Sequence, residues 1–322
     1  MDKCYKSIIT APRTPSAAKP ANSFARLNEL FARWIAGLDV LRPKSVETYD
    51  YAIRQFLRWL HKRGRLAELC LDDVLAYRDF LTKTKQPATV QIYMTALRRF
   101  FKWLEREGVY KNIAKHIKGV DVERCHKRDY LTVEQVKNVL EKIGPETERD
   151  RRDYAILSLM ITSGLRDTEI SRANVGDIGT AGESAVLYLR GEDRDEQAEY
   201  VELTEPVKEA VCRYLNGRGE LDTAAPLFTS VSRNSRDRRL STRSISEIAK
   251  RRLRAAGYDS DKLTAHSFRH SAVALALLGG LSLQEAQKFA RHNNITSTLT
   301  YAHHLERAGN RGAEIVTGAV FG

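Results

Sequence analysis

The chain has 322 residues, of which 42% are hydrophobic, so it can form one large domain or two ordinary ones and is not a disordered protein. No apolar run is long enough to span a bilayer, and residues 1–21 lack the apolar centre of a secretory signal. We therefore expect a soluble, cytoplasmic protein without a membrane partner, beginning with a flexible tail over residues 1–22. The four cysteines never occur at metal-ligand spacing, which argues against a zinc site.

The net charge of +12 is unevenly distributed along the chain. Residues 1–128 contain 26 Lys/Arg and 13 Asp/Glu, a net charge of +13, whereas residues 129–322 contain 27 and 28, a net charge of −1. This asymmetry favours a polyanionic partner, attracted by the N-terminal part, over an ordinary basic surface.

Residues 23–118 have the apolar spacing of four amphipathic helices. Four such helices in fewer than a hundred residues predict a compact helical bundle. The predicted helices begin before Leu27, at Pro43, near Asp72 and at Pro87, and Gly64 and Gly108 end the second and the fourth.

Residues 119–129 carry several charges and few large apolar side chains, so we interpret them as an interdomain linker. A second domain then extends over residues 130–322. Capping boxes are expected at Thr132 with Gln135 and at Ser282 with Glu285. The predicted elements are helices over 154–162 and 208–215, hairpin strands over 185–189 and 200–203, and a helix capped by Thr264 that runs to Leu278.

Two short motifs in this second domain combine arginine with other polar side chains. Arg166 follows a helix stop at Gly164 and stands at the start of another helix, where the helix dipole disfavours a cation, which mildly supports a function. Glu169 lies one turn further on and can hold Arg166 or a histidine in place. His266 and Arg269 fall at positions i and i+3 of one helix, so they can project to the same side. Such short motifs occur by chance far more often than they mark a site.

Tyr301 lies nine residues after His292, in a polar stretch. A lone tyrosine is usually a packing residue, so the interpretation of Tyr301 as a nucleophile depends on this spacing from His292. Arginine is well suited to holding phosphate oxygens, histidine moves protons near neutral pH, and a tyrosine hydroxyl can attack as a covalent nucleophile. The full candidate set is Arg166, His266, Arg269, His292 and Tyr301.

This set resembles the tyrosine recombinase (phage integrase) family, whose motifs are Thr-Gly-Leu-Arg-x-x-Glu, His-x-x-Arg and Leu-Gly-His, with Tyr nine residues after the last His. Residues 163–169 match the first motif with Ser for Thr, and residues 266–269 match the second. Residues 289–292 stand where Leu-Gly-His usually stands and keep only His292. The likeness extends from about residue 23 to the end. Because the tail is too short for a separate arm-binding domain, we expect an Xer-like or mobile-element integrase.

The resemblance implies a fold that is mainly α with a small β-sheet. A helical core-binding (SAM-like) domain over residues 23–118 would precede a mixed α/β catalytic domain over residues 130–322. Together with the resemblance, the basic helix faces favour contacts with DNA phosphates, although each single charge is better explained as a solvated position. These positions are Arg54, Arg58, Lys62, Arg63, Arg65, Arg98, Arg99 and Lys102.

The resemblance also implies a mechanism. Tyr301 attacks the scissile phosphate and leaves a 3′-phosphotyrosyl link, while Arg166 and Arg269 neutralise the transition state. His266 assists the loss of the tyrosine proton, and His292 donates a hydrogen bond to a phosphate oxygen. No metal or other cofactor is needed, because the bond energy is conserved.

One position departs from the family. Its catalytic lysine lies in the hairpin turn, where Glu192 stands here, and no lysine occurs between Lys142 and Lys208. Arg190 and Arg194 are near in the sequence, but arginine barely gives up a proton. A carboxylate beside the phosphate would repel it. We therefore predict slowed strand cleavage or an acid supplied from elsewhere.

The implied partners are double-stranded DNA with specific recombination sites and further copies of the chain, which form a homo-tetramer on paired sites. The segment 302–322 is expected to dock on a neighbouring protomer. The target sequence, the direction of the reaction and any accessory directionality proteins stay open. Two alternatives are a catalytically impaired paralogue that acts as a DNA-binding protein and a topoisomerase of related chemistry.

Overall fold

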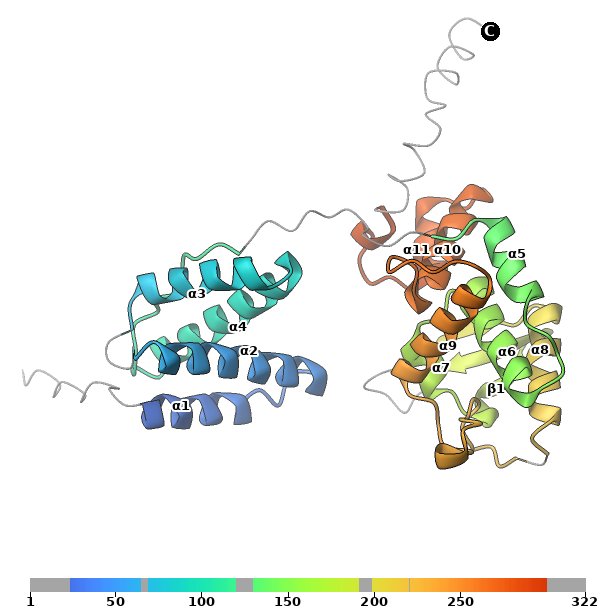
Figure 1. Ribbon diagram of the computed structural model, residues 1–322, viewed down its shortest axis with the longest axis horizontal. Coiled ribbons are helices and arrows are strands. Elements are labelled where there is room, and N and C mark those ends of the chain that lie inside the picture. The colour runs from blue at the N-terminus through green and yellow to red at the C-terminus, as the bar shows by residue number, and fades with distance from the viewer. Residues whose placement is uncertain (1–23, 65–68, 120–129, 191–198, 220, 300–322) are drawn as a thin grey trace, which may run out of the picture. The chain divides into compact units, whose positions relative to one another are not determined.

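The computed structural model describes residues 24–64, 69–119, 130–190, 199–219 and 221–299 (Figure 1). The chain divides into two units, Met1–Glu123 and Arg124–Gly322, and each has its own hydrophobic core. The described residues are mainly helical with one small sheet, which confirms the predicted fold class. Among these residues, no helix is both long enough and apolar enough to cross a membrane.

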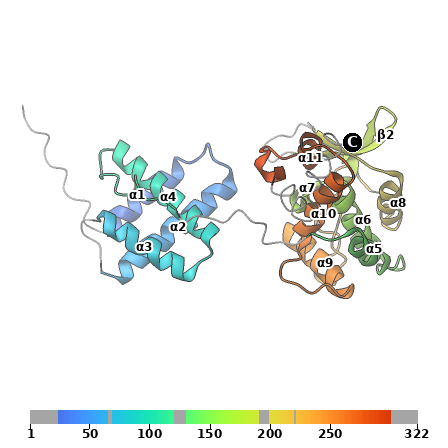
Figure 2. The ribbon, with the colours of Figure 1, turned by 90° about the horizontal axis from the view of Figure 1, so that it is seen from above.

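Four helices are described in the first unit, in the predicted order (Figure 2). Proline occupies the first turn of the second and fourth helices, where its missing N–H is not needed. Gly64 and Gly108 follow these two helices with φ of +64° and +66°, a backbone conformation that favours glycine. The helices are α1 (Phe24–Ala36), α2 (Pro43–Lys62), α3 (Leu71–Thr84) and α4 (Pro87–Arg106).

Aromatic side chains fill the core of the first unit. The ring centroids of Trp34 and Phe100 lie 5.3 Å apart, and those of Phe56 and Tyr77 lie 5.0 Å apart. Large rings bury much apolar surface each, so four short helices can form a stable core. The predicted apolar faces of α2 and α4 therefore point inward, and their basic residues remain at the surface or partly exposed.

Seven α-helices of the second unit are described. The capping boxes predicted at residues 132–135 and 282–285 are confirmed. Thr264 is the N-cap residue of the predicted helix, but within the described structure its hydroxyl has no hydrogen-bond partner. Its backbone N–H instead donates to Ser267 Oγ at 3.0 Å. The helices are α5 (Val133–Glu141), α6 (Glu148–Thr162), α7 (Asp167–Arg172), α8 (Glu205–Asn216), α9 (Thr242–Ala255), α10 (Ala265–Leu278) and α11 (Leu283–Ala290), with the short 3-10 helices η1 (Val175–Asp177) and η2 (Arg233–Ser235).

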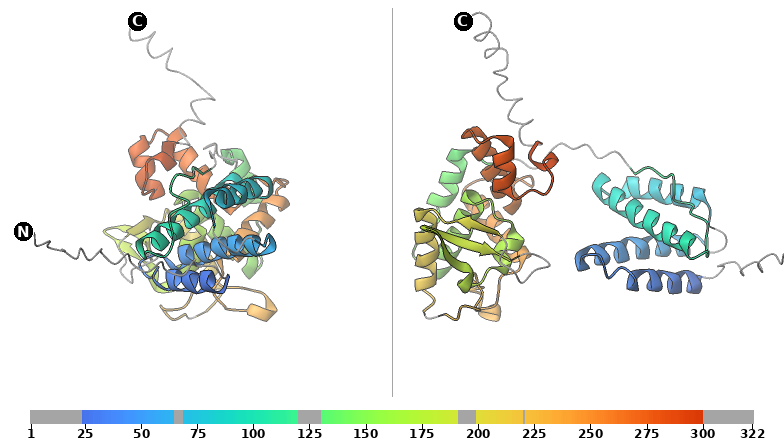
Figure 3. Two further views of the ribbon diagram at one scale, coloured as in Figure 1. Left: turned by 90° about the vertical axis from the view of Figure 1, so that its left-hand side faces the viewer. Right: turned by 180° about the vertical axis from the view of Figure 1, so that it is seen from behind.

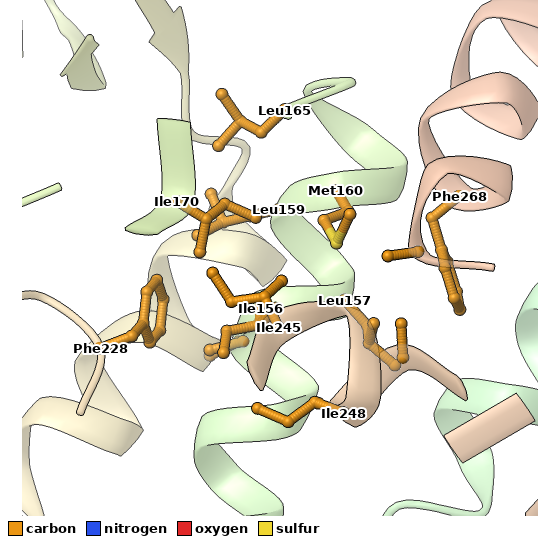
Figure 4. Close-up of a cluster of buried hydrophobic side chains, with 14 of the residues drawn as sticks. Ile156, Leu157, Leu159, Met160, Leu165, Ile170, Phe228, Ile245, Ile248 and Phe268 are labelled. Carbon is orange, nitrogen blue, oxygen red and sulfur yellow. The ribbon is translucent and has the colours of Figure 1, made fainter. Parts of the chain in front are cut away.

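Helix α6 contributes Ile156, Leu157, Leu159 and Met160 to the hydrophobic core of the second unit (Figure 4). Residues 155–160 are buried in an unbroken run, which requires neighbours on every side of the helix. Those neighbours are α5, α8, α9 and α10. The end of α6 leads directly to Gly164 and Arg166, so the position of this helix determines where the arginine motif lies.

A buried ion cluster joins α6 to α9. Asp153 is fully buried, and its carboxylate lies 2.7 Å from a guanidinium nitrogen of each of Arg152, Arg251 and Arg252. A carboxylate without such partners would be costly to bury. The cluster therefore ties the two helices together through charge as well as through apolar packing.

The sheet has three antiparallel strands, β1 (Ile178–Ala181), β2 (Ser184–Leu189) and β3 (Glu199–Glu202), in the order β1-β2-β3 (Figure 3). The β2–β3 pairing, with Leu187 opposite Val201, confirms the predicted hairpin. Strand β1 pairs with β2 through Ile178 opposite Leu187 and was not predicted, because its four residues include Gly179.

Candidate active site

A turn between α6 and α7 carries Arg166. Ser163 ends α6, and Gly164 follows with a φ of +57°, which strongly favours glycine. A Cβ atom at Gly164 would lie 3.4 Å from the ring of Phe289, an ordinary van der Waals contact, so the backbone conformation is what favours glycine there. Leu165 is fully buried and anchors the turn, which leaves Arg166 as the residue that caps α7.

The Arg166 guanidinium is held at two points. Its Nη1 donates to Glu169 Oε1 at 2.6 Å, and its Nη2 donates to the carbonyl oxygen of Arg291 at 2.8 Å. The backbone N–H of Arg166 also donates to Glu169 Oε2, at 2.7 Å. These contacts confirm the expectation that Glu169 supports Arg166, whose side chain remains 36% exposed.

Arg269 lies deeper than its helical position alone indicates. It is 1% exposed, and its guanidinium donates to the carbonyl oxygens of Gly164 and Ala290. His266, one turn earlier on α10, is exposed, and its ring packs edge-on against buried His270 at 4.5 Å. Arg269 thus joins the turn after α6 to the turn after α11, a role that the motif spacing did not predict.

His292 follows α11, and its Nδ1 forms a hydrogen bond with Thr298 Oγ1 at 3.0 Å. This contact fixes the orientation of the imidazole, because Thr298 is itself buried. Burial is the largest cause that lowers the pKa of His292, and the nearby charges of Arg269, Arg166, His266 and Arg291 act in the same direction. Together they lower the pKa to about 4, so the ring is neutral at pH 7.

Arg291 is a third guanidinium in this region that sequence reasoning did not include. Its Nη2 donates to Glu169 Oε2 at 3.0 Å and to Gly164 O at 3.2 Å. Its Nη1 donates to Ser163 O at 3.2 Å and to Phe289 O at 3.1 Å. The signal in the sequence was the replacement of Leu-Gly-His by a run that contains arginine.

A cavity of about 480 Å³ opens beside His266, between the start of α7, α9 and the start of α10. Lys250 lines it, but its Nζ donates to Ser260 O at 2.5 Å and lies 3.6 Å from Asp259 Oδ1. The remaining lining residues are Asp167, Arg243, Ser246, Glu247 and Thr264. The cavity thus exposes His266 to a space in which a substrate group can lie.

The structure therefore brings Arg166, Arg269 and His292 together and places His266 within reach of their charges. Tyr301 and Glu192 lie outside the described residues. Arg190 is described, and its guanidinium makes bidentate contacts of 2.9–3.0 Å with buried Asp177. The Arg190 side chain is therefore held in an ion pair with Asp177.

Three clustered guanidiniums and one carboxylate leave an excess of positive charge beside a neutral imidazole. Such forks of planar donors are typical of proteins that act on phosphate esters.

Comparison with protein families shows the family to which the chain belongs. Residues 129–307 match the phage integrase family, and residues 29–108 match the phage integrase N-terminal SAM-like domain. The chain belongs to the phage integrase family, the tyrosine recombinases.

Curated relatives agree with this assignment. The chain is 27% identical to the tyrosine recombinase XerC of Caldanaerobacter subterraneus subsp. tengcongensis, covering 91% of this chain and 87% of the relative. It is also 27% identical to the tyrosine recombinase XerD of Bifidobacterium longum, covering 88% and 94%.

Solved structures share the fold. The XerH recombinase in a post-cleavage complex with a palindromic difH substrate has a TM-score of 0.70 and 19% identity, covering 89% of this chain and 84% of that chain. A lambda integrase dimer bound to a COC′ core site has a TM-score of 0.64 and 16% identity, covering 85% and 94%.

Proposed function

We propose that the chain is a site-specific recombinase that cleaves and rejoins DNA strands through a 3′-phosphotyrosyl intermediate on Tyr301. The observation that carries this proposal is the convergence of Arg166, Arg269 and His292 on the turn at residues 290–292. Arg166 and Arg269 come from separate motifs, yet both donate to neighbouring carbonyl groups of that turn. This arrangement supports a site for one phosphate group.

In the proposed reaction the Tyr301 oxygen attacks the scissile phosphorus, and the bond from phosphorus to the 5′ oxygen breaks. The tyrosine loses its proton with help from His266, and the released 5′ oxygen gains one. Arg166 and Arg269 offset the charge that develops on the phosphate oxygens, and His292 donates a hydrogen bond to one of them. Attack by the 5′-hydroxyl of a second duplex reverses these steps and restores Tyr301.

The two units have separate roles in this proposal. The helical unit, residues 23–118, binds the recombination site through exposed basic residues of α2 and α4, including Arg58, Lys62 and Lys102. Residues 130–322 form the catalytic domain, joined to it by the linker at 119–129. Four protomers on two paired sites complete the exchange, and the segment at 302–322 links neighbours.

A duplex with a nick near the scissile phosphate tests the proposal. The short fragment diffuses away after cleavage, so the covalent protein–DNA adduct accumulates and is measured on a denaturing gel. We expect an adduct with the wild-type chain and none with Tyr301→Phe, while both bind the intact site equally. An adduct that persists in Tyr301→Phe contradicts the proposed nucleophile.

A catalytically impaired paralogue that acts as a DNA-binding protein is the second candidate, and Glu192 in the place of the family's lysine favours it. The nicked-duplex experiment separates these two functions, because tight, site-specific binding without any adduct indicates the binding protein. A separate assay tests for a topoisomerase, which would relax supercoiled DNA that lacks a specific site.

A further inference from the structure

Arg291 occupies a backbone conformation that favours glycine. Its φ and ψ are 51° and 49°, in the left-handed region, where a residue other than glycine is strained. Its Nε is buried and has no hydrogen-bond partner within the described structure. A residue with two such unfavourable features is kept in place by its other contacts, and such positions are often functional.

The side chain of Arg291 joins two turns that hold the other arginines. Its contacts with Ser163 O and Gly164 O reach the turn before Arg166, and its contact with Phe289 O stays within its own turn. Its carbonyl oxygen accepts from Arg166. Because the side chain is only 10% exposed, it is buried against these groups and does not face solvent.

Arg291 also changes the charge balance at Glu169. The carboxylate contacts Arg166 at 2.6 Å and Arg291 at 3.0 Å, so its single negative charge is shared between two guanidiniums. Burial opposes the ionisation of Glu169, but Arg291 foremost, and then Arg166, hold its pKa below the ordinary value. Without Arg291, Glu169 would offset the charge of Arg166 alone.

We propose that Arg291 is a positioning residue for strand cleavage, which shares the charge of Glu169 and fixes the turns at residues 163–166 and 289–292. In this way Arg166 keeps a net positive charge toward the phosphate, and both phosphate-binding arginines keep their carbonyl partners. The inference rests on the proposed recombinase function and adds a residue that does not touch the phosphate.

Two substitutions at Arg291 test the proposal in the full-length chain. Arg291→Gly removes the guanidinium and relieves the backbone, whereas Arg291→Lys keeps the charge but loses the forked donor. Asp237→Gly is the matched control, because Asp237 is the other residue besides glycine with a positive φ in the described ranges, at 61°. Each variant is measured for thermal stability, for the rate of adduct formation on the nicked duplex, and for its affinity for two intact duplexes.

The two intact duplexes differ only at the scissile position, which is a normal phosphate in one and an uncharged methylphosphonate in the other. The ratio of the two affinities reports how strongly the site binds that phosphate charge, whether or not cleavage follows. We expect Arg291→Gly to lower this ratio and to slow adduct formation by about 10- to 100-fold, with the methylphosphonate affinity unchanged. Arg291→Lys should lie between wild type and Arg291→Gly, and Asp237→Gly should match wild type.

The role of Arg291 is overturned if Arg291→Gly stays within about twofold of wild type in both the rate and the affinity ratio. It is also overturned if adduct rate, stability and both affinities fall in parallel, since that pattern indicates a structural role only. A wild-type chain that forms no adduct would refute the proposed function, but the affinity ratio would still decide whether Arg291 supports phosphate binding.

Discussion

Replacing Asp153 with asparagine tests the buried ion cluster of the second unit. At an effective dielectric constant of about 20, a charge pair at 2.7 Å attracts by about 6 kcal/mol. Asp153 makes three such pairs, but the Arg251 side chain is 47% exposed and screened, and the desolvation of buried charges offsets much of the rest. Asp153→Asn also leaves three guanidiniums crowded around a neutral amide, of which Arg252 keeps its pairing with Asp150 at 2.5 Å. We therefore expect the free energy of unfolding to fall by about 3–5 kcal/mol.

For a unit of this size, that loss lowers the unfolding midpoint by about 6–20 °C. Thermal unfolding of the full chain is followed by far-ultraviolet circular dichroism, because all three tryptophans lie in the first unit, at Trp34, Trp59 and Trp103. Asp259→Asn is the control, since that carboxylate pairs with Arg254 at 2.9 Å but is 64% exposed. A midpoint for Asp153→Asn within about 2 °C of wild type, or no lower than that of the control, would refute the reasoning.

Four further predictions concern the candidate site. Gly164→Ala adds a Cβ atom to a backbone with a φ of +57°, so denaturant unfolding should show a loss of about 1–2 kcal/mol. The pKa of His292, measured by NMR titration of the free protein, should be about 4 and should rise in Arg166→Gln, because one repelling charge is removed. The unfolded chain binds the His292 proton more tightly than the folded chain does. The contribution of neutral His292 to stability is therefore complete above about pH 6.5 and is lost as the pH falls toward 4. Acid unfolding of the wild type, compared with that of His292→Gln, measures this loss. Glu192→Lys should accelerate adduct formation on the nicked duplex, and an unchanged rate would show that the chain obtains its acid elsewhere.

Much of the local structure follows from the order of the amino acids. Pro43 and Pro87 mark the first turns of α2 and α4, because a ring that presets φ and lacks an N–H is accommodated best there. The four-residue pattern from Thr132 to Gln135 predicted a capping box, and both of its hydrogen bonds form. Likewise, Glu169 lies one turn from Arg166 and contacts it, as the spacing indicated.

Tertiary structure decided the burial of Arg269 and the contacts of Arg291. The sequence placed Arg269 one turn from His266, but not its burial against carbonyl groups of two distant turns. Arg291 was visible only as a departure from glycine, and its contact with Glu169, 122 positions away, requires the turns after α6 and α11 to meet. Helical propensity and capping depend on neighbours a few residues apart, so the sequence determines them locally. Burial and charge pairing depend on which remote segments pack together, and only the folded chain brings those segments into contact.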